Sequence, residues 1–594
     1  MMVFKSYACK DTNKREQYKI KIARFILYSA RLFVTLTYCR SYLRSGIKYN
    51  LFYFVFRSLI RNFAELIIKK EMKKIRIIPF LFLLFATGCL AEGYDKDACT
   101  SIMVGKKASA DGSVITSHTC DSWYRTWMNI VPEKDYPKDT LVNIYEGTMH
   151  TEHADDQTGV KEKGKIPQVK HTYRYLNTAY PCLNEHQLGI GETTYGGRDT
   201  MRNKSGMFMI EELERIALER CTTAREAIRL MGELIKKYGY GDSGECLTIA
   251  DPNEVWIFEV QGEGPKKIGG VWAAQRIPDN EIAVSANVSR IGRIDLSDPD
   301  HFMASDNVFE VARKMKLWDG KEEFSFWKAY SGGNYNKEKK NYSVRELYIM
   351  QQLAPSKGFT DDMEELPVSV QPDSLVSVER VAKLLASYYE GTDQSLSCRI
   401  DSLAAKSEVK GKAMITNPWM RPDEIKLYGK LLNDSTMQNI RTVSVSWCAY
   451  STIIQLRSWL PDEIGGVAWI CLDNPGQSPR FPIFAGNSTL PMMLNICGQH
   501  RLRDDAALWH FRQANRLATV RWGNCREAME NARQYFYDKG KRELPFVEQT
   551  WQSIDNDKDK KEFLNGYTRD FFGATITRWD ELYRKYTRQL WSGF

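Results

Sequence analysis

Three side chains suited to nucleophilic chemistry lie close together in the sequence: the thiol of Cys99, the imidazole of His118 and the carboxylate of Asp121. Two β-prone runs, CTSIMVG and SVITSH, make up most of this segment, and the Asp-Gly pair between them is typical of a hairpin turn. In such a hairpin, the residue opposite Cys99 lies between His118 and Tyr124, at about 5 Å. The pattern predicts a thiol beside an imidazole or a carboxylate, as in a catalytic nucleophile.

Cys99 has two interpretations. Most strand cysteines are small apolar core residues without chemistry of their own. The position of Cys99 favours a second role, because a cut between Ala98 and Cys99 would give this residue a free α-amine. Such an amine has an ordinary pKa of about 7.7–8.0 and can act as the base for its own thiol.

The residues before Cys99 have the pattern of an export signal. Residues 72–91 combine a basic start, a short apolar core and a small-residue end. We expect cleavage after Ala91 or, alternatively, lipid attachment at Cys89, which would anchor the protein to a membrane. Residues 92–98 are then a short propeptide, and the mature protein is expected in the periplasm, at the cell surface or outside the cell.

The positive net charge of +9 belongs to the N-terminal segment. Residues 1–71 contain 15 Lys and Arg against 4 Asp and Glu, whereas the other 523 residues carry 68 basic and 70 acidic side chains. The near-neutral body gives no reason to expect a nucleic-acid partner. Since a signal normally begins a chain, we interpret residues 1–71 as upstream translation before a true start at Met72; the alternative is a membrane-attached extension.

The elements that must position Cys99 are mostly strands, followed by helices. We expect strands in residues 188–197, 245–262, 269–278, 281–291, 441–457 and 465–473, and helices in residues 207–221 and 222–239. The second helix has a capping box at its start and Gly239 at its end. Residues 245–262 read as a hairpin that the next two strands extend as a meander, and the pattern turns helical from Asp504. This order predicts an α+β protein.

Several segments in one order resemble the dipeptidase A family of cysteine N-terminal nucleophile (Ntn) hydrolases, which is related to secernins, penicillin V acylases and bile salt hydrolases. The resemblance runs from Cys99 to about Gly486. It rests on CTSIMVGKKASADGSVITSHTCDS (99–122), NEHQLGIGETT (184–194), GECLTIADPNEVWIFEV (244–260), VSANVSRIG (284–292), YSVRELYIMQQLAP (342–355) and QLRSWLP (455–461).

The resemblance implies a four-layer αββα Ntn-hydrolase sandwich over residues 99–503, with a helical C-terminal extension over residues 504–594, and it implies amide hydrolysis. It also implies site residues: Cys99 as nucleophile, Asp121 to hold the new α-amine, Asn287 to donate to the oxyanion, Arg345 beside them, and Thr193 or Thr194 on the oxyanion side.

One position departs from the family pattern, because many relatives have an arginine where this chain has His118. A histidine can favour a thiolate, as that arginine would, only when it is protonated, so activity would depend on acidic pH. Alternatively, His118 is a hydrogen-bonded strand residue.

For the charged ends of a small peptide substrate, the candidate contacts are Glu185, Glu192 and Arg198, although each is more often a structural or solvated charge.

The other sequence patterns do not indicate a binding site for a metal or another cofactor. The histidines and carboxylates of residues 150–156 lie in a polar loop without helical spacing, and the residues of HTCD alternate faces of a strand, so we expect no metal at either place. The Gly-rich run at 189–197 lacks the features of a phosphate-binding loop. The 13 cysteines contain no CxxC pair and are expected to be mostly buried free thiols, with one or two bridges if the protein is exported.

Together these features predict an exported cysteine dipeptidase that matures by removal of everything before Cys99. One alternative is an N-acyl amide hydrolase of the same scaffold, similar to bile salt hydrolases or penicillin V acylases. Another is a non-catalytic, lipid-anchored surface protein that keeps Cys99 inside the chain.

Overall fold

The computed structural model describes residues 99–331, 340–392, 394–397, 400, 416–434 and 440–592, which belong to one compact unit. The predicted upstream extension (1–71), export signal (72–91, with Cys89) and propeptide (92–98) lie outside the described residues. Within the described part of the chain, no helix is both long enough and apolar enough to cross a lipid bilayer.

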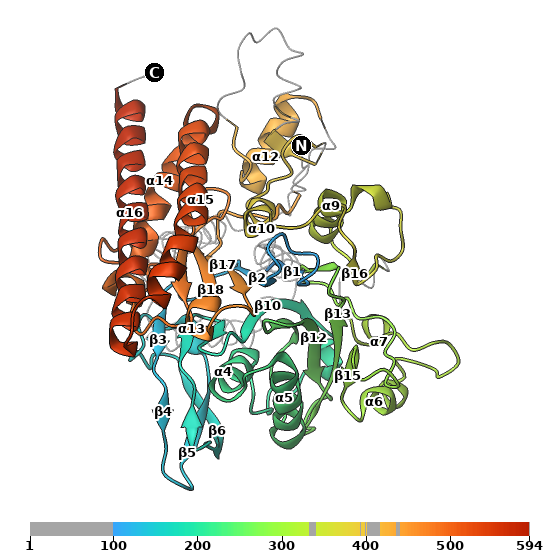
Figure 1. The fold of residues 1–594 in the computed structure, drawn as a ribbon. Coiled ribbons are helices and arrows are strands. Elements are labelled where there is room, and N and C mark those ends of the chain that lie inside the picture. The colour runs from blue at the N-terminus through green and yellow to red at the C-terminus, as the bar shows by residue number, and fades with distance from the viewer. Residues whose placement is uncertain are drawn as a thin grey trace, which may run out of the picture. The chain divides into compact units, whose positions relative to one another are not determined.

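Seven of the described strands form an antiparallel sheet in the order β16-β14-β1-β2-β17-β18-β19 (Figure 1). Their bounds are β1 (Ser101–Val104), β2 (Val114–Cys120), β14 (Ile282–Ser285), β16 (Ser369–Val370), β17 (Tyr450–Leu456), β18 (Val467–Leu472) and β19 (Phe481–Phe484). Strands β1 and β2 form the predicted hairpin, in which Thr100 lies opposite Thr119 and Val104 opposite Ile115. This register places Cys99 at the level of Cys120, between His118 and Asp121.

A second antiparallel sheet contains eight of the described strands in the order β15-β13-β12-β11-β10-β9-β8-β3. Their bounds are β3 (Asn129–Val131), β8 (Tyr175–Asn177), β9 (Leu183–Asn184), β10 (Gly189–Gly196), β11 (Gly244–Ala250), β12 (Val255–Gly262), β13 (Gly270–Ile277) and β15 (Phe302–Ala304). Two small ribbons lie apart, β4 (Lys134–Asp135) with β7 (His171–Thr172) and β5 (Leu141–Glu146) with β6 (Lys161–Pro167).

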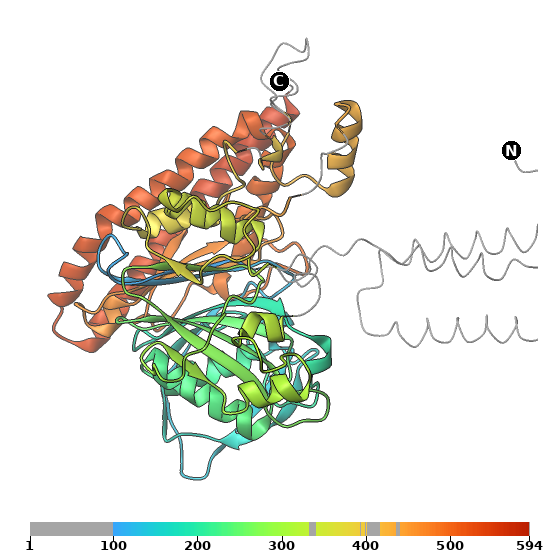
Figure 2. The same ribbon diagram turned by 90° about the vertical axis from the view of Figure 1, so that its right-hand side faces the viewer.

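The two large sheets pack against each other through β2 and β17 on one side and β10 and β11 on the other, as Figure 2 shows. The hydroxyls of Thr116 and Thr248 meet across this interface at 2.5 Å. Gly191 permits the close approach, because an added Cβ there would lie 2.6 Å from the carbonyl oxygen of Ser117. The interface brings the start of β1 close to β10.

The prediction that residues 281–291 continue the meander is wrong. Strand β13 pairs with β12 as expected, but β14 leaves that sheet and pairs with β1, with Ser101 opposite Ser285. Strand β15 occupies the other edge of β13 instead. An alternation of apolar and polar residues indicates a strand but not the strand that it pairs with, because both sheets bury apolar faces of the same kind. Because β14 pairs with β1, Asn287, two residues after β14, lies beside Cys99.

The helices lie mainly between and after the strands. Their bounds are α4 (Ile210–Arg220), α5 (Ala224–Tyr238), α6 (Val308–Lys314), α7 (Phe326–Tyr330), α9 (Val344–Leu353), α10 (Val378–Leu385), α12 (Pro422–Leu431), α13 (Asp462–Gly465), α14 (Ala507–Val520), α15 (Trp522–Gln552) and α16 (Asp557–Trp591). Short 3-10 turns occupy Thr148–His150, Asp199–Met201, Pro355–Lys357 and Met492–Asn495. Helix α5 begins at the predicted capping box of Thr223 and Glu226 and ends at Gly239, whose φ is 83°.

Helices pack on both sheets. Helix α5 lies on β11, β12 and β13 of the second sheet, whereas α9 contacts β14 and α10 contacts β17 of the first. The predicted C-terminal helices are present as α14, α15 and α16, which pack on β18 and β19 and bury Phe511 and Trp579. The α+β class is confirmed, and the Ntn-hydrolase sandwich stays a prediction at this level.

Some details of the elements differ from expectation. The strand predicted for residues 441–457 begins only at Tyr450, so Arg441 lies in the irregular segment before it. Most cysteines of the described part, among them Cys99, Cys182 and Cys246, are buried free thiols, as predicted.

Candidate active site

Cys99 lies two residues before the first residue of β1, and only 1% of its surface is exposed. Its Sγ is 3.5 Å from Oε2 of Glu192 on β10. Burial raises the pKa of the Cys99 thiol well above its usual range, and the nearby Glu192 carboxylate raises it further. In the uncut chain the sulfur is therefore held as a thiol, so activation needs a base that acts on it at short range.

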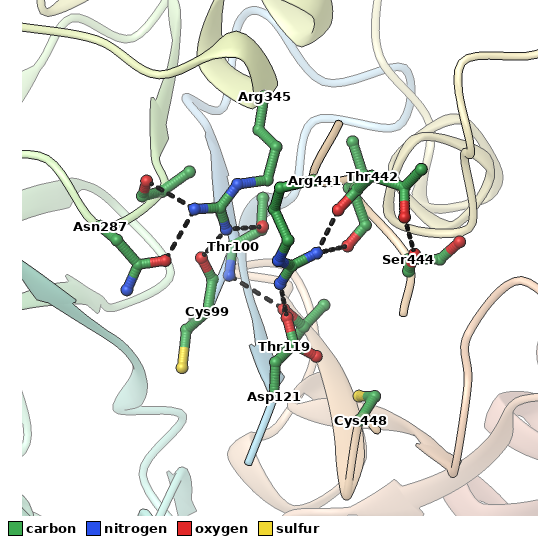
Figure 3. Close-up of polar contacts among 12 residues, drawn as sticks. Cys99, Thr100, Thr119, Asp121, Asn287, Arg345, Arg441, Thr442, Ser444 and Cys448 are labelled. Carbon is green, nitrogen blue, oxygen red and sulfur yellow. Dashed lines mark hydrogen bonds and ion pairs between the residues drawn. The ribbon is translucent and has the colours of Figure 1, made fainter. Parts of the chain in front are cut away.

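Arg345, on α9, holds the main chain of Cys99 in place (Figure 3). Its Nη1 donates to the carbonyl oxygen of Cys99 at 2.6 Å and to Oγ1 of Thr100 at 3.0 Å. Its Nη2 donates to the carbonyl oxygen of Ala286 at 3.0 Å and to Oδ1 of Asn287 at 2.8 Å. One buried guanidinium thus joins the nucleophile to the predicted oxyanion donor, which a planar fork of donors allows.

Asn287 has the left-handed backbone conformation, with φ of 65°. A non-glycine residue in this region costs about 1–3 kcal/mol and persists where the surroundings impose it. Here Arg345 binds its Oδ1, and its Nδ2 donates to the carbonyl oxygen of Thr194 at 2.6 Å. These two contacts orient the amide with its nitrogen toward β10 and its oxygen toward the guanidinium.

Asp121 follows β2 and is completely buried. Its Oδ2 accepts from Oγ1 of Thr119 at 2.8 Å and from Nη2 of Arg441 at 2.7 Å. Thr119 Oγ1 also accepts from the backbone N–H of Thr100 at 2.9 Å, so this hydroxyl links the carboxylate to the residue after Cys99. The other carboxylate oxygen, Oδ1, is buried and accepts no N–H or O–H hydrogen bond from the described residues. The thiol of Cys448 also interacts with this carboxylate, and burial together with Asp121 raises the pKa of that thiol.

Arg441 is the site residue that sequence reasoning missed. It lies 320 positions from Asp121 in the chain, in a segment that we expected to be a strand. No local pattern marks it, because an arginine before a β-prone run is most simply a solvated charge. Burial lowers the pKa of Arg441, and its ion pair with Asp121 opposes that shift.

His118 is buried, with its ring between the edges of Tyr180 and Tyr450. Its Nε2 lies 3.5 Å from Oε2 of Glu192 but makes no hydrogen bond among the described residues. Burial lowers the pKa of His118 to about 3, so the imidazole is neutral at ordinary pH. The lowered pKa counts against a protonated His118 that favours the thiolate, and that role stays a prediction. The structure places the His118 imidazole in the core, in a fixed orientation between two tyrosine rings.

Glu192 is a buried acid in the centre of this group. Burial raises the pKa of its carboxyl to about 8, and the buried Glu214 on α4 raises it further. Its Oε1 accepts from Oγ1 of Thr194 at 3.1 Å. Thr193, in contrast, meets the hydroxyl of Ser285 on β14 at 2.5 Å and so joins the two sheets. Of the two threonines, Thr194 is the one that contacts both Glu192 and Asn287.

The two remaining candidates have contacts of their own. Glu185 accepts from Nη2 of Arg174 at 3.0 Å in an ion pair. Arg198 donates to the carbonyl oxygens of Lys328 and Ala329, the latter at 2.6 Å. These contacts are typical of structural charges rather than of groups that bind a substrate.

One group of side chains in the described part of the chain brings metal-ligand atoms together. The ligand atoms of Cys99, His118 and Glu192 all lie within 4.8 Å of one another. We expected no metal at HTCD because its own residues alternate faces, but the third ligand type comes from a different sheet.

Comparison with known proteins gives a consistent assignment. The sequence profile described as Peptidase family C69 matches residues 98–535. A protein named "Probable dipeptidase" from Latilactobacillus sakei is 26% identical, over 66% of this chain and 76% of the relative. Another "Probable dipeptidase", from Salmonella dublin, is 27% identical over 68% and 84%. A "Dipeptidase" from Bifidobacterium longum is 22% identical over 74% and 80%.

Proposed function

Since the chain belongs to peptidase family C69, we propose that it is a cysteine dipeptidase whose nucleophile becomes the N-terminal residue when the chain is cut between Ala98 and Cys99. The relatives named dipeptidases support the substrate class. Packing of helices on both of the facing sheets supports assignment to the αββα Ntn-hydrolase sandwich. In this assignment residues 99–503 form the catalytic domain, and residues 504–594 form the helical extension.

The observation that carries the proposal is Oδ1 of Asp121, which accepts no N–H or O–H hydrogen bond from the described residues. A buried carboxylate oxygen without a donor costs about 1–3 kcal/mol, so it calls for an N–H or O–H donor that the described residues of the uncut chain do not give it. The new α-amine of Cys99 is such a donor, one residue away from the Thr100 amide that Thr119 links to Asp121. Cutting the chain would thus supply the missing partner and create the base at the same time.

The reaction follows from these positions. The α-amine takes the proton of the Cys99 thiol, and the thiolate attacks the carbonyl carbon of the scissile peptide bond. Asn287 Nδ2 donates to the oxyanion, a type of contact worth about 3–4 kcal/mol in the transition state. The protonated amine then gives its proton to the leaving amine, and water hydrolyses the thioester to free the thiol again.

Arg345 and Arg441 position these groups without taking part in bond making. Arg345 ties the carbonyl of Cys99 to Asn287, so the nucleophile and the oxyanion donor keep one separation. Arg441 donates to Oδ2 of Asp121 and fixes that oxygen, which leaves Oδ1 for the α-amine. Glu192 contacts Sγ of Cys99 and Thr194 contacts Glu192, so these two residues are our candidates for contact with the polar end of a dipeptide.

The first test is N-terminal sequencing of the purified protein with a hydrolysis assay on a panel of dipeptides. We expect a chain that starts at Cys99 and dipeptide turnover that Cys99→Ala abolishes. Cys525→Ala, at a buried thiol in α15, is the matched control and should retain turnover. Active protein that starts at Glu92 or at a lipidated Cys89 contradicts the mechanism, and turnover of glycine-conjugated bile salts without dipeptide turnover favours the acyl amide hydrolase.

A further inference from the structure

The three ligand-type atoms beside Cys99 have the spacing of a transition-metal site. Oε2 of Glu192 lies 3.5 Å from Sγ of Cys99 and 3.5 Å from Nε2 of His118. In a tetrahedral zinc site with ordinary bond lengths, the corresponding oxygen–sulfur and oxygen–nitrogen separations are about 3.6 Å and about 3.4 Å. The set of three, all within 4.8 Å, therefore needs only small side-chain adjustments to share one ion.

The chemistry of the set also fits such an ion. A thiolate, a neutral imidazole and a carboxylate are the ligands that Zn²⁺ takes in proteins. His118 Nε2 is buried, makes no hydrogen bond among the described residues and lies 3.5 Å from Oε2 of Glu192. A buried imidazole nitrogen without a partner is costly, and the hydrolytic mechanism gives this nitrogen no task.

Maturation would complete the coordination. The α-amine and Sγ of an N-terminal cysteine bind one ion together in a five-membered chelate ring, so the mature chain offers four ligand atoms where the uncut chain offers three. This part of the argument rests on the proposed function, because only a cut before Cys99 frees the amine. Four protein ligands close a tetrahedral site and leave no open position for a substrate.

We propose that Cys99, His118 and Glu192, joined by the α-amine of mature Cys99, bind Zn²⁺ or a similar transition-metal ion that reversibly blocks the nucleophile. Binding forms bonds from the metal to Sγ of Cys99 and to Oε2 of Glu192, and it releases to solvent both the thiol proton and the proton that the buried Glu192 carboxyl holds. The metal occupies the thiol and the amine that catalysis uses, so it and the substrate exclude each other. The His118 position distinguishes this chain from relatives that have the arginine implied by the family resemblance, because an arginine there cannot bind a cation.

The test titrates the purified protein with Co²⁺ alone and follows the visible absorption of a tetrahedral, thiolate-bound ion. We expect one ion per chain, and we expect Zn²⁺ to displace it and to stop dipeptide hydrolysis until a chelator is added. His118→Gln should weaken Co²⁺ binding by at least about 10²-fold, since even partners one shell further out contribute 10–100-fold. His510→Gln is the matched control, because His510 pairs with Asp580 among the C-terminal helices.

The outcomes separate this proposal from the proposed function. An active enzyme that shows no Co²⁺ absorption and no inhibition by Zn²⁺ overturns the metal site and leaves the peptidase intact. Equal Co²⁺ affinity in the parent protein and in His118→Gln also overturns it. Uncut, inactive protein that binds Co²⁺ through His118 supports the three-residue site and counts against the proposed maturation.

Discussion

Replacement of Arg345 by methionine tests whether one guanidinium keeps the nucleophile and the oxyanion donor in register. Arg345 is 4% exposed and donates to four acceptors, two of which belong to Cys99 and Asn287. Methionine has a similar length and no donor. It leaves four buried acceptors that each cost about 1–3 kcal/mol, so we expect the free energy of unfolding to fall by at least about 4 kcal/mol.

The catalytic effect follows from geometry. Without Arg345, the strained backbone of Asn287 loses the contact at Oδ1 and keeps only the one from Nδ2 to Thr194. A misplacement of about 1 Å costs about 10²-fold in rate, or about 2.7 kcal/mol. We expect kcat to fall by about 10²-fold with little change in KM, because the lost contacts matter mainly in the transition state.

The assay measures kcat and KM on one dipeptide at a temperature where urea titration shows the variant to be folded, with the N-terminus sequenced to establish maturation. Arg345→Lys keeps the charge but cannot donate to all four acceptors, so its kcat should be intermediate. Arg198→Met, which also removes a guanidinium bound to backbone carbonyls, should leave kcat unchanged. Folded, matured Arg345→Met with the parent kcat would refute the reasoning.

Three further changes test the buried charges of the site. Asp121→Asn leaves Arg441 without its ion-pair partner, so urea titration should show a loss of about 3 kcal/mol that is partly restored in the Asp121→Asn/Arg441→Met double variant; additive losses would contradict the pairing. The folded-state pKa of His118 is lowered to about 3, so the parent should lose stability as pH falls from about 6.5 toward 3, by up to about 1.4 kcal/mol per pH unit, and His118→Gln should show a shallower urea-midpoint profile. The folded-state pKa of Glu192 is raised to about 8, so its contribution should be lost as pH rises from about 4.5 through 8, and unchanged pH profiles in Glu192→Gln would contradict the buried acid.

Local sequence patterns accounted for the parts of the fold that depend on near neighbours. The hairpin from Cys99 to Asp121 was predictable, because β-propensity and an Asp-Gly turn act within about ten residues. The capping box of Thr223 and Glu226 and the stop at Gly239 likewise located helix α5. The resemblance added Asn287 and Arg345, whose contacts with each other no spacing rule connects.

Residue types and their spacing were enough to indicate that a thiol stands at the start of the first strand and that a carboxylate returns beside it. Packing of the two sheets set how distant groups meet there: Glu192 comes from the second sheet, and Asn287, which the resemblance had named, follows a strand that leaves the meander. Arg441, 320 positions beyond Asp121, was not expected at all. The tertiary structure also decided the charge state of His118, because burial rather than residue type sets the pKa. Strand order and desolvation arise from packing of the whole chain, so short-range patterns do not contain them.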